Sequence, residues 1–122
     1  MKSNQVIESI LSIPTKLYLE GIDASFYELL KQTGYFNLHN SIKVVDILDM
    51  LKRRPDFADN WLLLSENKRV NSGWYFKKRS DGKYVVGYHP QSSNIELCEY
   101  IDIKVACANF IKNEIENIRE QS

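Results

Sequence analysis

The spacing of apolar positions changes near residue 72. Before that point hydrophobic side chains recur at helical spacing, and after it aromatic and β-branched residues gather in two short segments, residues 74–78 and 84–88. Asp81 and Gly82 lie between these segments. This pair favours a tight turn, because Gly has no Cβ and Asp tolerates the left-handed region. The pattern therefore predicts a β-hairpin at the centre of the sheet.

The N-terminal part of the chain reads as short helices. Residues 4–13 carry apolar side chains at helical spacing, and Pro14 cannot continue that helix. A second short helical turn is expected over residues 14–19, which gives a helix, a break and a helix. Ser25 and Glu28 have the spacing of a capping box and predict the start of the next helix.

Two further helices are expected before the hairpin. After a loop over residues 35–40, Ser41 is the predicted N-cap of a helix that Pro55 ends. The apolar face of that helix follows the i, i+3, i+4, i+7 rule and consists of Val44, Ile47, Leu48 and Leu51. A shorter helix is expected over residues 57–64. Its WLLL run, residues 61–64, also fits an edge strand, and the sequence leaves this alternative open.

After the hairpin, the segment 90–94 (PQSSN) has the composition of a loop. Alternation over residues 95–100 predicts a third antiparallel strand, and Asp102 is placed to cap a long last helix. The apolar stripe of that helix is Ile103, Cys107, Ile111, Ile115 and Ile118, widened by Ala106 and Phe110. The predicted fold is α+β, with N-terminal helices, a three-stranded antiparallel β-meander and a long C-terminal helix packed on it.

Composition adds limits to this picture. The length of 122 residues predicts one domain, residues 1–122, and the hydrophobic content of 43% is ordinary for a globular protein. Sixteen basic and sixteen acidic residues cancel, which disfavours direct nucleic-acid binding and binding to anionic membranes. The N-terminus lacks the apolar core of a signal peptide, and no apolar run is long enough to cross a bilayer. We therefore expect a cytoplasmic protein without a membrane partner.

No motif for catalysis or for a cofactor is found. His39 and His89 have no Cys or His at zinc-ligand spacing, and the five glycines form neither a dinucleotide fingerprint nor a phosphate loop. Cys98 and Cys107 are expected to be buried thiols, although a single disulfide would also fit. We expect no catalytic residue, no metal and no cofactor, so the chain is predicted not to be an enzyme.

The charges are unevenly distributed. The hairpin region carries Lys77, Lys78 and Arg79 beside aromatic residues, which is typical of an RNA-binding sheet if the aromatic side chains are exposed. The segment that follows is acidic, with Glu96 and Glu99 in the predicted strand. An acidic rim beside an apolar patch suits binding to a basic protein such as a nuclease.

Several runs in the second half resemble one family of proteins. They are the S-E-x-x-R run at residues 65–69, the G-W-Y-F entry to the hairpin at 73–76, the V-G-Y strand at 86–88 and the A-C-A-x-F-I helix start at 106–111. Together they look like the C-terminal part of small bacterial immunity proteins of contact-dependent growth inhibition (CDI) systems. The resemblance covers roughly residues 42–118.

The resemblance implies a non-catalytic inhibitor of a cognate toxin domain, the C-terminal region of a large secreted adhesin. In such systems the toxins are frequently nucleases that act on tRNA, and the inhibitor covers the active site or blocks the substrate. Inhibitors of nucleases are often strongly acidic, whereas this chain is neutral, which favours binding beside the active site. The alternatives are a small RNA- or protein-binding module that uses the basic hairpin, and a hydrolase without a recognisable motif.

For an immunity protein, fast association favours exposed charge and slow release favours a few aromatic anchors. The acidic strand and its entry into the last helix combine the two. The expected toxin-binding residues are Glu96, Glu99, Tyr100 and Asp102, with Trp74 or Tyr75 as an added anchor.

Overall fold

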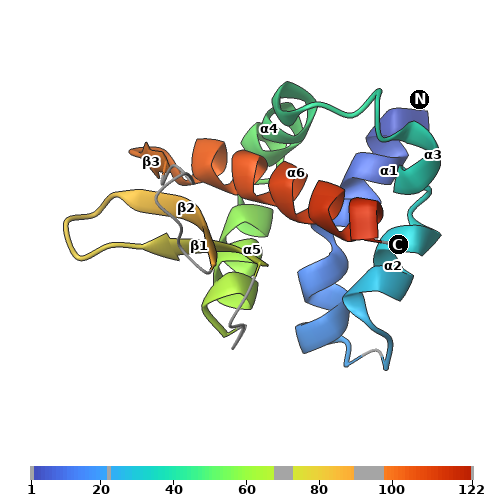
Figure 1. The fold of residues 1–122 in the computed structure, drawn as a ribbon, viewed down its shortest axis with the longest axis horizontal. Helices are drawn as coiled ribbons and strands as arrows, with labels where there is room; N and C mark the ends of the chain where they lie inside the picture. The colour runs from blue at the N-terminus through green and yellow to red at the C-terminus, as the bar shows by residue number, and fades with distance from the viewer. Residues whose placement is uncertain (1, 22, 68–72, 90–97, 122) are drawn as a thin grey trace.

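The α+β fold is confirmed by a computed structural model that describes residues 2–21, 23–67, 73–89 and 98–121 (Figure 1). A helical N-terminal half precedes a small sheet and a long last helix. The elements are α1 (Lys2–Leu11), η1 (Thr15–Leu19, a π-helix), α2 (Phe26–Gln32), α3 (Tyr35–Leu38), α4 (Val44–Arg53), α5 (Asp56–Asn67), β1 (Gly73–Lys78), β2 (Tyr84–His89), β3 (Cys98–Tyr100) and α6 (Ile103–Gln121).

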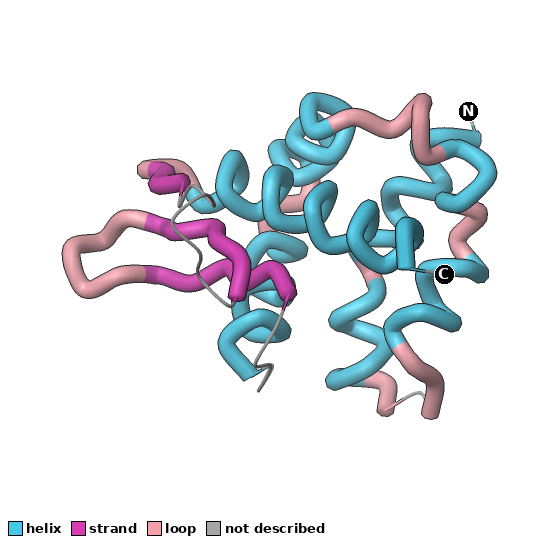
Figure 2. Tube along the Cα trace, in the orientation of Figure 1, coloured by secondary structure: helices cyan, strands magenta, loops and turns pink. Residues whose placement is uncertain are grey.

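Helix α6 organises the molecule. It runs across the middle of Figure 1, with the sheet near its start and the α1–α3 region near its end. It packs against α4, α5 and all three strands. Figure 2 shows α6 crossing in front of other helices while the strands lie together at one side. The predicted long C-terminal helix on a meander is thus confirmed.

The sheet is an antiparallel meander in the order β1-β2-β3. In its register Phe76 lies opposite Val86, and Tyr84 lies opposite Tyr100. The predicted turn is confirmed, because Gly82 has φ of +88°, a conformation that side chains with a Cβ rarely adopt. The Asp81 carboxylate accepts a hydrogen bond from the Lys83 backbone N–H at 3.0 Å and so supports the turn.

Three aromatic rings from different elements meet in the core. Trp61 of α5, Phe76 of β1 and Phe110 of α6 are each fully buried. The Phe110 ring centroid lies 6.2 Å from that of Trp61 and 5.6 Å from that of Phe76. The Trp61 indole N–H donates to the Leu11 carbonyl at 3.1 Å, which ties α5 to the end of α1. These rings join the helical half to the sheet.

The outer edge of β1 is closed by a side chain of α5. The backbone N–H of Phe76 donates to Ser65 Oγ at 2.7 Å, and both residues are buried. An N–H that points away from β2 would otherwise lack a partner in a region that water does not reach. The Ser65 hydroxyl therefore supplies the hydrogen-bond acceptor that the Phe76 N–H lacks on the outer side of β1.

Four local predictions need correction. Residues 35–38 form the short helix α3 and not a loop, since Tyr35 is anchored in the core. Lys43, and not Ser41, stands at the N-cap of α4, where its N–H donates to the Asp46 carboxylate at 2.9 Å. The WLLL run is helical within α5, which confirms the predicted helix, and only the edge-strand alternative is wrong.

The fourth correction concerns the cysteines. Cys107 is buried as predicted, but Cys98 is exposed, because it lies on the edge strand β3. Both thiols are free, so the disulfide alternative is also wrong.

The predicted helix cap at Ser25 and the predicted helix break at Pro14 agree with the structure. Ser25 Oγ accepts from the Glu28 backbone N–H at 3.1 Å, which confirms the capping interaction at the start of α2. Helix α1 ends at Leu11, and after one turn around Pro14 the chain winds as the wider η1. Pro14 has no N–H to continue the α-helical pattern, which accounts for the break.

Candidate functional site: an exposed corner and an acidic aromatic pocket

The end of β3 and the start of α6 form a corner that contains Glu99, Tyr100, Ile101 and Asp102, here called the acidic corner. Asp102 shapes it by capping α6, because its carboxylate accepts from the Lys104 backbone N–H at 2.8 Å and its carbonyl accepts from Ala106 at 3.1 Å. Tyr100 is half-buried and packs against the core. Two of the predicted binding residues, Tyr100 and Asp102, thus stabilise the fold at this corner.

Glu99 is engaged within the chain. Arg79, from the hairpin turn, donates to Glu99 at 2.6 Å and to Asp81 at 2.6 Å. The hydrogen bond from Arg79, aided by the Lys83 backbone N–H, lowers the pKa of the Asp81 carboxyl from 3.8 to about 2. The same two carboxylates raise the pKa of the Arg79 guanidinium. One guanidinium is shared between two carboxylates, and the charge of the nearby Lys83 ammonium also acts on Asp81.

Ile101 is the feature of this corner that sequence reasoning missed. Its side chain is 85% exposed, whereas Val45, Leu63 and Tyr27 elsewhere on the surface are 56%, 53% and 40% exposed. Ile101 stands between Tyr100 and Asp102, and its burial against a partner would lower the free energy of the complex. The alternation of apolar residues gave no sign that this one would face outward.

The predicted anchors Trp74 and Tyr75 lie apart from the corner. In the register, Lys78 of β1 is opposite Tyr84, which in turn is opposite Tyr100. Trp74 stands four positions back along β1, about 13 Å from the Lys78 end at ~3.3 Å per residue. Glu96 lies outside the described residues. The structure therefore groups Glu99, Tyr100 and Asp102, and separates the two aromatic residues from them.

The two aromatic residues also differ in direction, since successive strand residues face opposite sides of a sheet. Trp74 is half-buried, packs against the core and meets the Tyr88 ring edge-on at 5.3 Å. Tyr75 belongs to the other face, where the Lys77 ammonium lies 5.4 Å from its ring centroid. Because Phe76 is fully buried and Trp74 and Tyr84 pack on the core, the aromatic residues are not presented as an RNA-binding surface would present them.

Trp74 does line a small pocket on another side. The pocket has a volume of about 210 Å³ and is lined by Trp74, Asn113, Glu116, Asn117 and Glu120, here called the Trp74 pocket. The four α6 residues follow the i, i+3, i+4, i+7 rule and so share one face of the helix. Amides and carboxylates thus stand beside one indole ring. The sequence places Glu116 and Glu120 in the last helix, but their position beside Trp74 depends on how α6 packs on the sheet.

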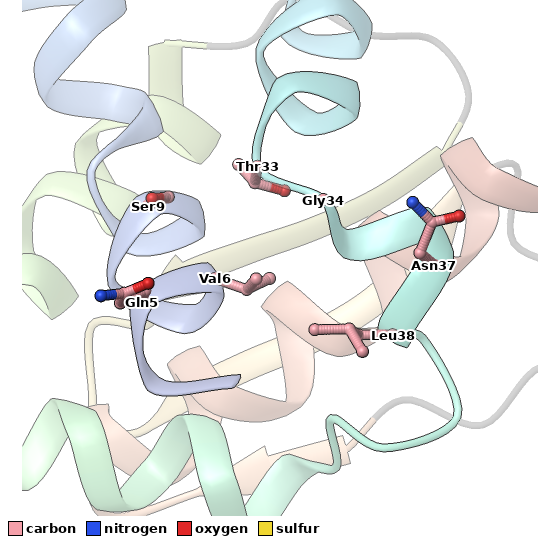
Figure 3. Close-up of a pocket in the computed structure, with 7 residues that line it drawn as sticks. All are labelled: Gln5, Val6, Ser9, Thr33, Gly34, Asn37 and Leu38. Atoms are coloured by element: carbon pink, nitrogen blue, oxygen red, sulfur yellow. The ribbon is translucent and has the colours of Figure 1, made fainter. Parts of the chain in front are cut away.

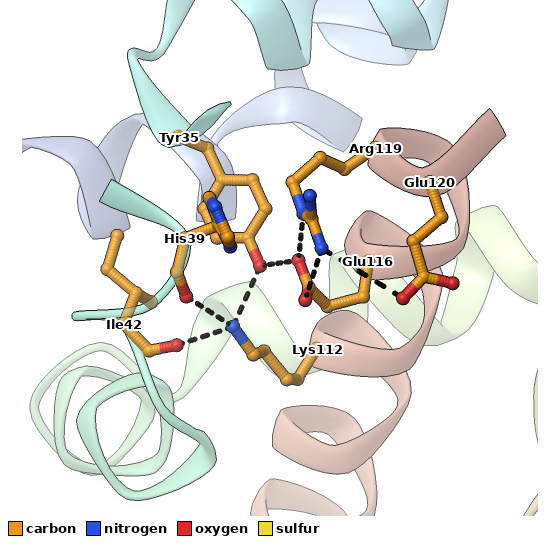
Figure 4. Close-up of polar contacts among 7 residues, drawn as sticks. All are labelled: Tyr35, His39, Ile42, Lys112, Glu116, Arg119 and Glu120. Carbon is orange, nitrogen blue, oxygen red and sulfur yellow. Dashed lines mark hydrogen bonds and ion pairs between the residues drawn. The ribbon is translucent and has the colours of Figure 1, made fainter. Parts of the chain in front are cut away.

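A polar network beside this pocket fixes the Glu116 carboxylate (Figure 4). Glu116 accepts from the Tyr35 hydroxyl and from Arg119 Nε, the latter at 2.9 Å. Burial disfavours its ionised form, but these two hydrogen bonds and the charges of Lys112 and Arg119 together outweigh burial and leave the pKa of Glu116 below its usual value. Glu120 lies at the outer side of the network, 3.9 Å from Arg119.

Lys112 is the second centre of the network (Figure 4). Its ammonium donates to Tyr35 Oη at 2.8 Å and to the carbonyls of His39 and Ile42 at 2.9 and 2.6 Å. Burial lowers the pKa of Lys112, and burial together with the hydrogen bond to Glu116 raises the pKa of Tyr35. The network connects α6 to the segment that contains α3. His39 contributes its backbone carbonyl to this network.

A larger groove lies between α1 and the α2–α3 turn (Figure 3). Its volume is about 500 Å³. Its lining is uncharged and consists of Gln5, Val6, Ser9, Thr33, Gly34, Asn37 and Leu38. Thr33 is already bonded, because its hydroxyl donates to Leu30 and accepts from the Tyr35 N–H. No titratable group lines this groove, so it offers no acid, base or charge with which to act on a substrate.

The described part of the chain brings together no group of three His, Cys, Asp or Glu side chains that could hold a metal ion. Within the same residues, none of the helices is both long and apolar enough to cross a membrane. Comparison of the chain with protein-family models, with curated proteins and with solved structures finds no match.

Proposed function

We propose that this protein is an immunity protein that binds and inactivates a cognate toxin domain of a CDI system, as the resemblance of residues 42–118 implies. One observation carries the proposal beyond that resemblance, namely the 85% exposure of Ile101 at the acidic corner. Burial of an isoleucine side chain against a partner contributes about 1.5–3 kcal/mol, and the surrounding carboxylates would guide a basic partner toward it.

In this proposal the acidic corner acts by binding to the toxin domain and blocking it, without catalysis. A protein inhibitor needs a few desolvated anchor groups within a charged rim, and it needs no reacting group of its own. Ile101 supplies an apolar group, and Glu99, Asp81 and Asp102 supply carboxylates around it, two of which pair with Arg79. A partner with an apolar depression surrounded by basic residues would fit this corner. A nuclease that binds tRNA offers such basic surroundings.

The test searches the neighbouring open reading frames for an adhesin with a C-terminal toxin domain, and titrates that purified domain with the protein. Ile101→Asp is expected to weaken binding at least tenfold, equivalent to ~1.4 kcal/mol, because a charge would replace the apolar contact. Val45→Asp is the matched control, since Val45 is also exposed but lies on α4. Replacement of Glu96 and Glu99 by Lys is expected to slow association. Equal affinity of the Ile101 and Val45 variants would remove the acidic corner from the interface.

RNA binding through the hairpin remains the alternative, favoured by the exposed Lys77, Lys78 and Lys83. A gel-shift at two salt concentrations separates the two functions, because binding driven by phosphate contacts falls steeply with salt. Retention of a tRNA band by the isolated protein at low salt, lost at high salt and in a Lys77→Gln variant, would favour the RNA-binding module over the immunity protein.

A further inference from the structure

We infer that the Trp74 pocket is a receptor for one arginine side chain of a protein partner. This inference rests on the proposed function for the identity of the partner, and it adds a second contact point distinct from the acidic corner. The pocket volume of about 210 Å³ is below the ~300–1,000 Å³ of sites for drug-sized ligands, and it suits a single long side chain.

The lining matches a guanidinium group. Trp74 provides an indole ring, the aromatic surface on which arginine stacks best. Glu120 and Glu116 provide carboxylates, and the side-chain amides of Asn113 and Asn117 add carbonyl oxygens of the kind that accept from N–H donors. A planar cation with five N–H donors can use an aromatic wall and several acceptors at once, whereas the compact ammonium of lysine uses them less well.

The two carboxylates of the pocket have different tasks. Glu116 is already held by Tyr35 and Arg119, so its position is fixed. Glu120 is the more available anion, because its side chain is 67% exposed and its separation of 3.9 Å from Arg119 exceeds hydrogen-bond distance. Arg119 and Lys112 project toward Tyr35 and the end of α3, on the neighbouring face of α6 (Figure 4). The α6 residues that line the pocket carry carboxylates and amides, and Arg119 pairs with both carboxylates from the neighbouring face.

A small probe tests the pocket without the toxin. N-acetyl-arginine amide is titrated into ¹⁵N-labelled protein, and the indole N–H signals are followed. The Trp74 signal is expected to shift in a saturable way with a dissociation constant in the millimolar range. The Trp61 signal is an internal control, because Trp61 is fully buried and bonded to Leu11. N-acetyl-citrulline amide, which has nearly the same shape and no charge, is expected to give no saturable shift.

Two variants with matched controls complete the test. Glu120→Gln is expected to weaken binding of the arginine amide at least threefold, whereas Glu66→Gln, an exposed glutamate on α5, is expected to leave it unchanged. Trp74→Leu is expected to weaken it as much, read from the backbone amide signals of Asn113 and Glu120 because the Trp74 indole signal is lost. Tyr27→Leu is the control for loss of an exposed aromatic ring. Equal shifts with the arginine and citrulline amides, or unchanged affinity in Glu120→Gln, would overturn the inference.

Binding measurements with the toxin domain then distinguish a failure of this inference from a failure of the proposed function. If the inference is correct, Glu120→Gln weakens toxin binding at least threefold, and Ile101→Asp does so independently. Toxin binding that is unaffected by Glu120→Gln would overturn the pocket as a partner site and leave the immunity function standing. Saturable binding of the arginine amide without any binding of the toxin domain would support the pocket and refute the proposed partner.

Discussion

Removal of the Ser65 hydroxyl tests how the edge of β1 is satisfied. In Ser65→Ala the N–H of Phe76 loses its acceptor, which lies at 2.7 Å between two buried residues. A buried donor left without a partner costs about 1–3 kcal/mol. Alanine is a better helix former than serine by less than ~0.7 kcal/mol, which offsets part of this cost in α5. The expected net loss in free energy of unfolding is therefore about 0.3–3 kcal/mol.

Unfolding in guanidinium chloride measures this loss. The slope of the free energy with denaturant should stay the same, because the folded core is unchanged, and the midpoint should fall. Ser9→Ala on α1 is the control, since it changes helix propensity without removing an acceptor from the sheet. Hydrogen exchange adds a local reading, because the Phe76 amide should lose protection relative to its neighbours in β1.

The result that would refute the reasoning is equally specific. If Ser65→Ala is as stable as Ser9→Ala and the Phe76 amide keeps its protection, another group satisfies that amide. The edge of β1 would then be closed by something other than the hydroxyl.

Three more predictions concern stability and titration. Phe110→Ala should lower the free energy of unfolding by about 3–5 kcal/mol, because the ring is fully buried, and Tyr27→Ala, at an exposed ring, should cost far less in the same denaturant titration. The Asp81 carboxyl should titrate by NMR with a pKa of about 2, below its value in the unfolded chain. The stabilising effect of the ionised Asp81 is therefore present above pH ~4 and is lost as pH falls toward 2. Arg79→Gln should return the Asp81 pKa toward 3.8, and no change would contradict the ion pair. Because its pKa is raised, Tyr35 should stay protonated above pH ~10, where exposed tyrosines ionise. Its contribution to stability is present below that pH and is lost as pH rises. An ultraviolet titration in which all seven tyrosines ionise together in the folded protein would contradict this.

The sequence predicted features whose causes are local. The Asp81–Gly82 turn, the Ser25 cap and the start of α6 after Asp102 each depend on residues within a few positions of one another. The period of the apolar residues was likewise enough to place α4 and the core face of α6.

The errors concern features that depend on distant residues. The short α3 is held by Tyr35, whose hydroxyl partner Glu116 is 81 positions away. The exposure of Cys98 follows from its place on an edge strand, which alternation alone does not reveal. The engagement of Glu99 by Arg79 needed the register of three strands.

The candidate site was predicted only in part for the same reason. The acidic residues at the start of α6 were identified, but neither the outward direction of Ile101 nor the meeting of Trp74 with Glu120 follows from the order of residues.

The position of Lys112 has a consequence for how the protein is made. Its ammonium bonds the carbonyl of Ile42, which is 70 positions earlier in the chain, and so holds a segment that leaves the ribosome long before it. At synthesis rates of about 5–20 residues per second, Lys112 is synthesised roughly 4–14 s after Ile42. The helical half therefore cannot reach its final form until α6 has emerged. If α6 also carries the arginine receptor, a nascent chain would become able to capture a partner only when its synthesis has passed α6.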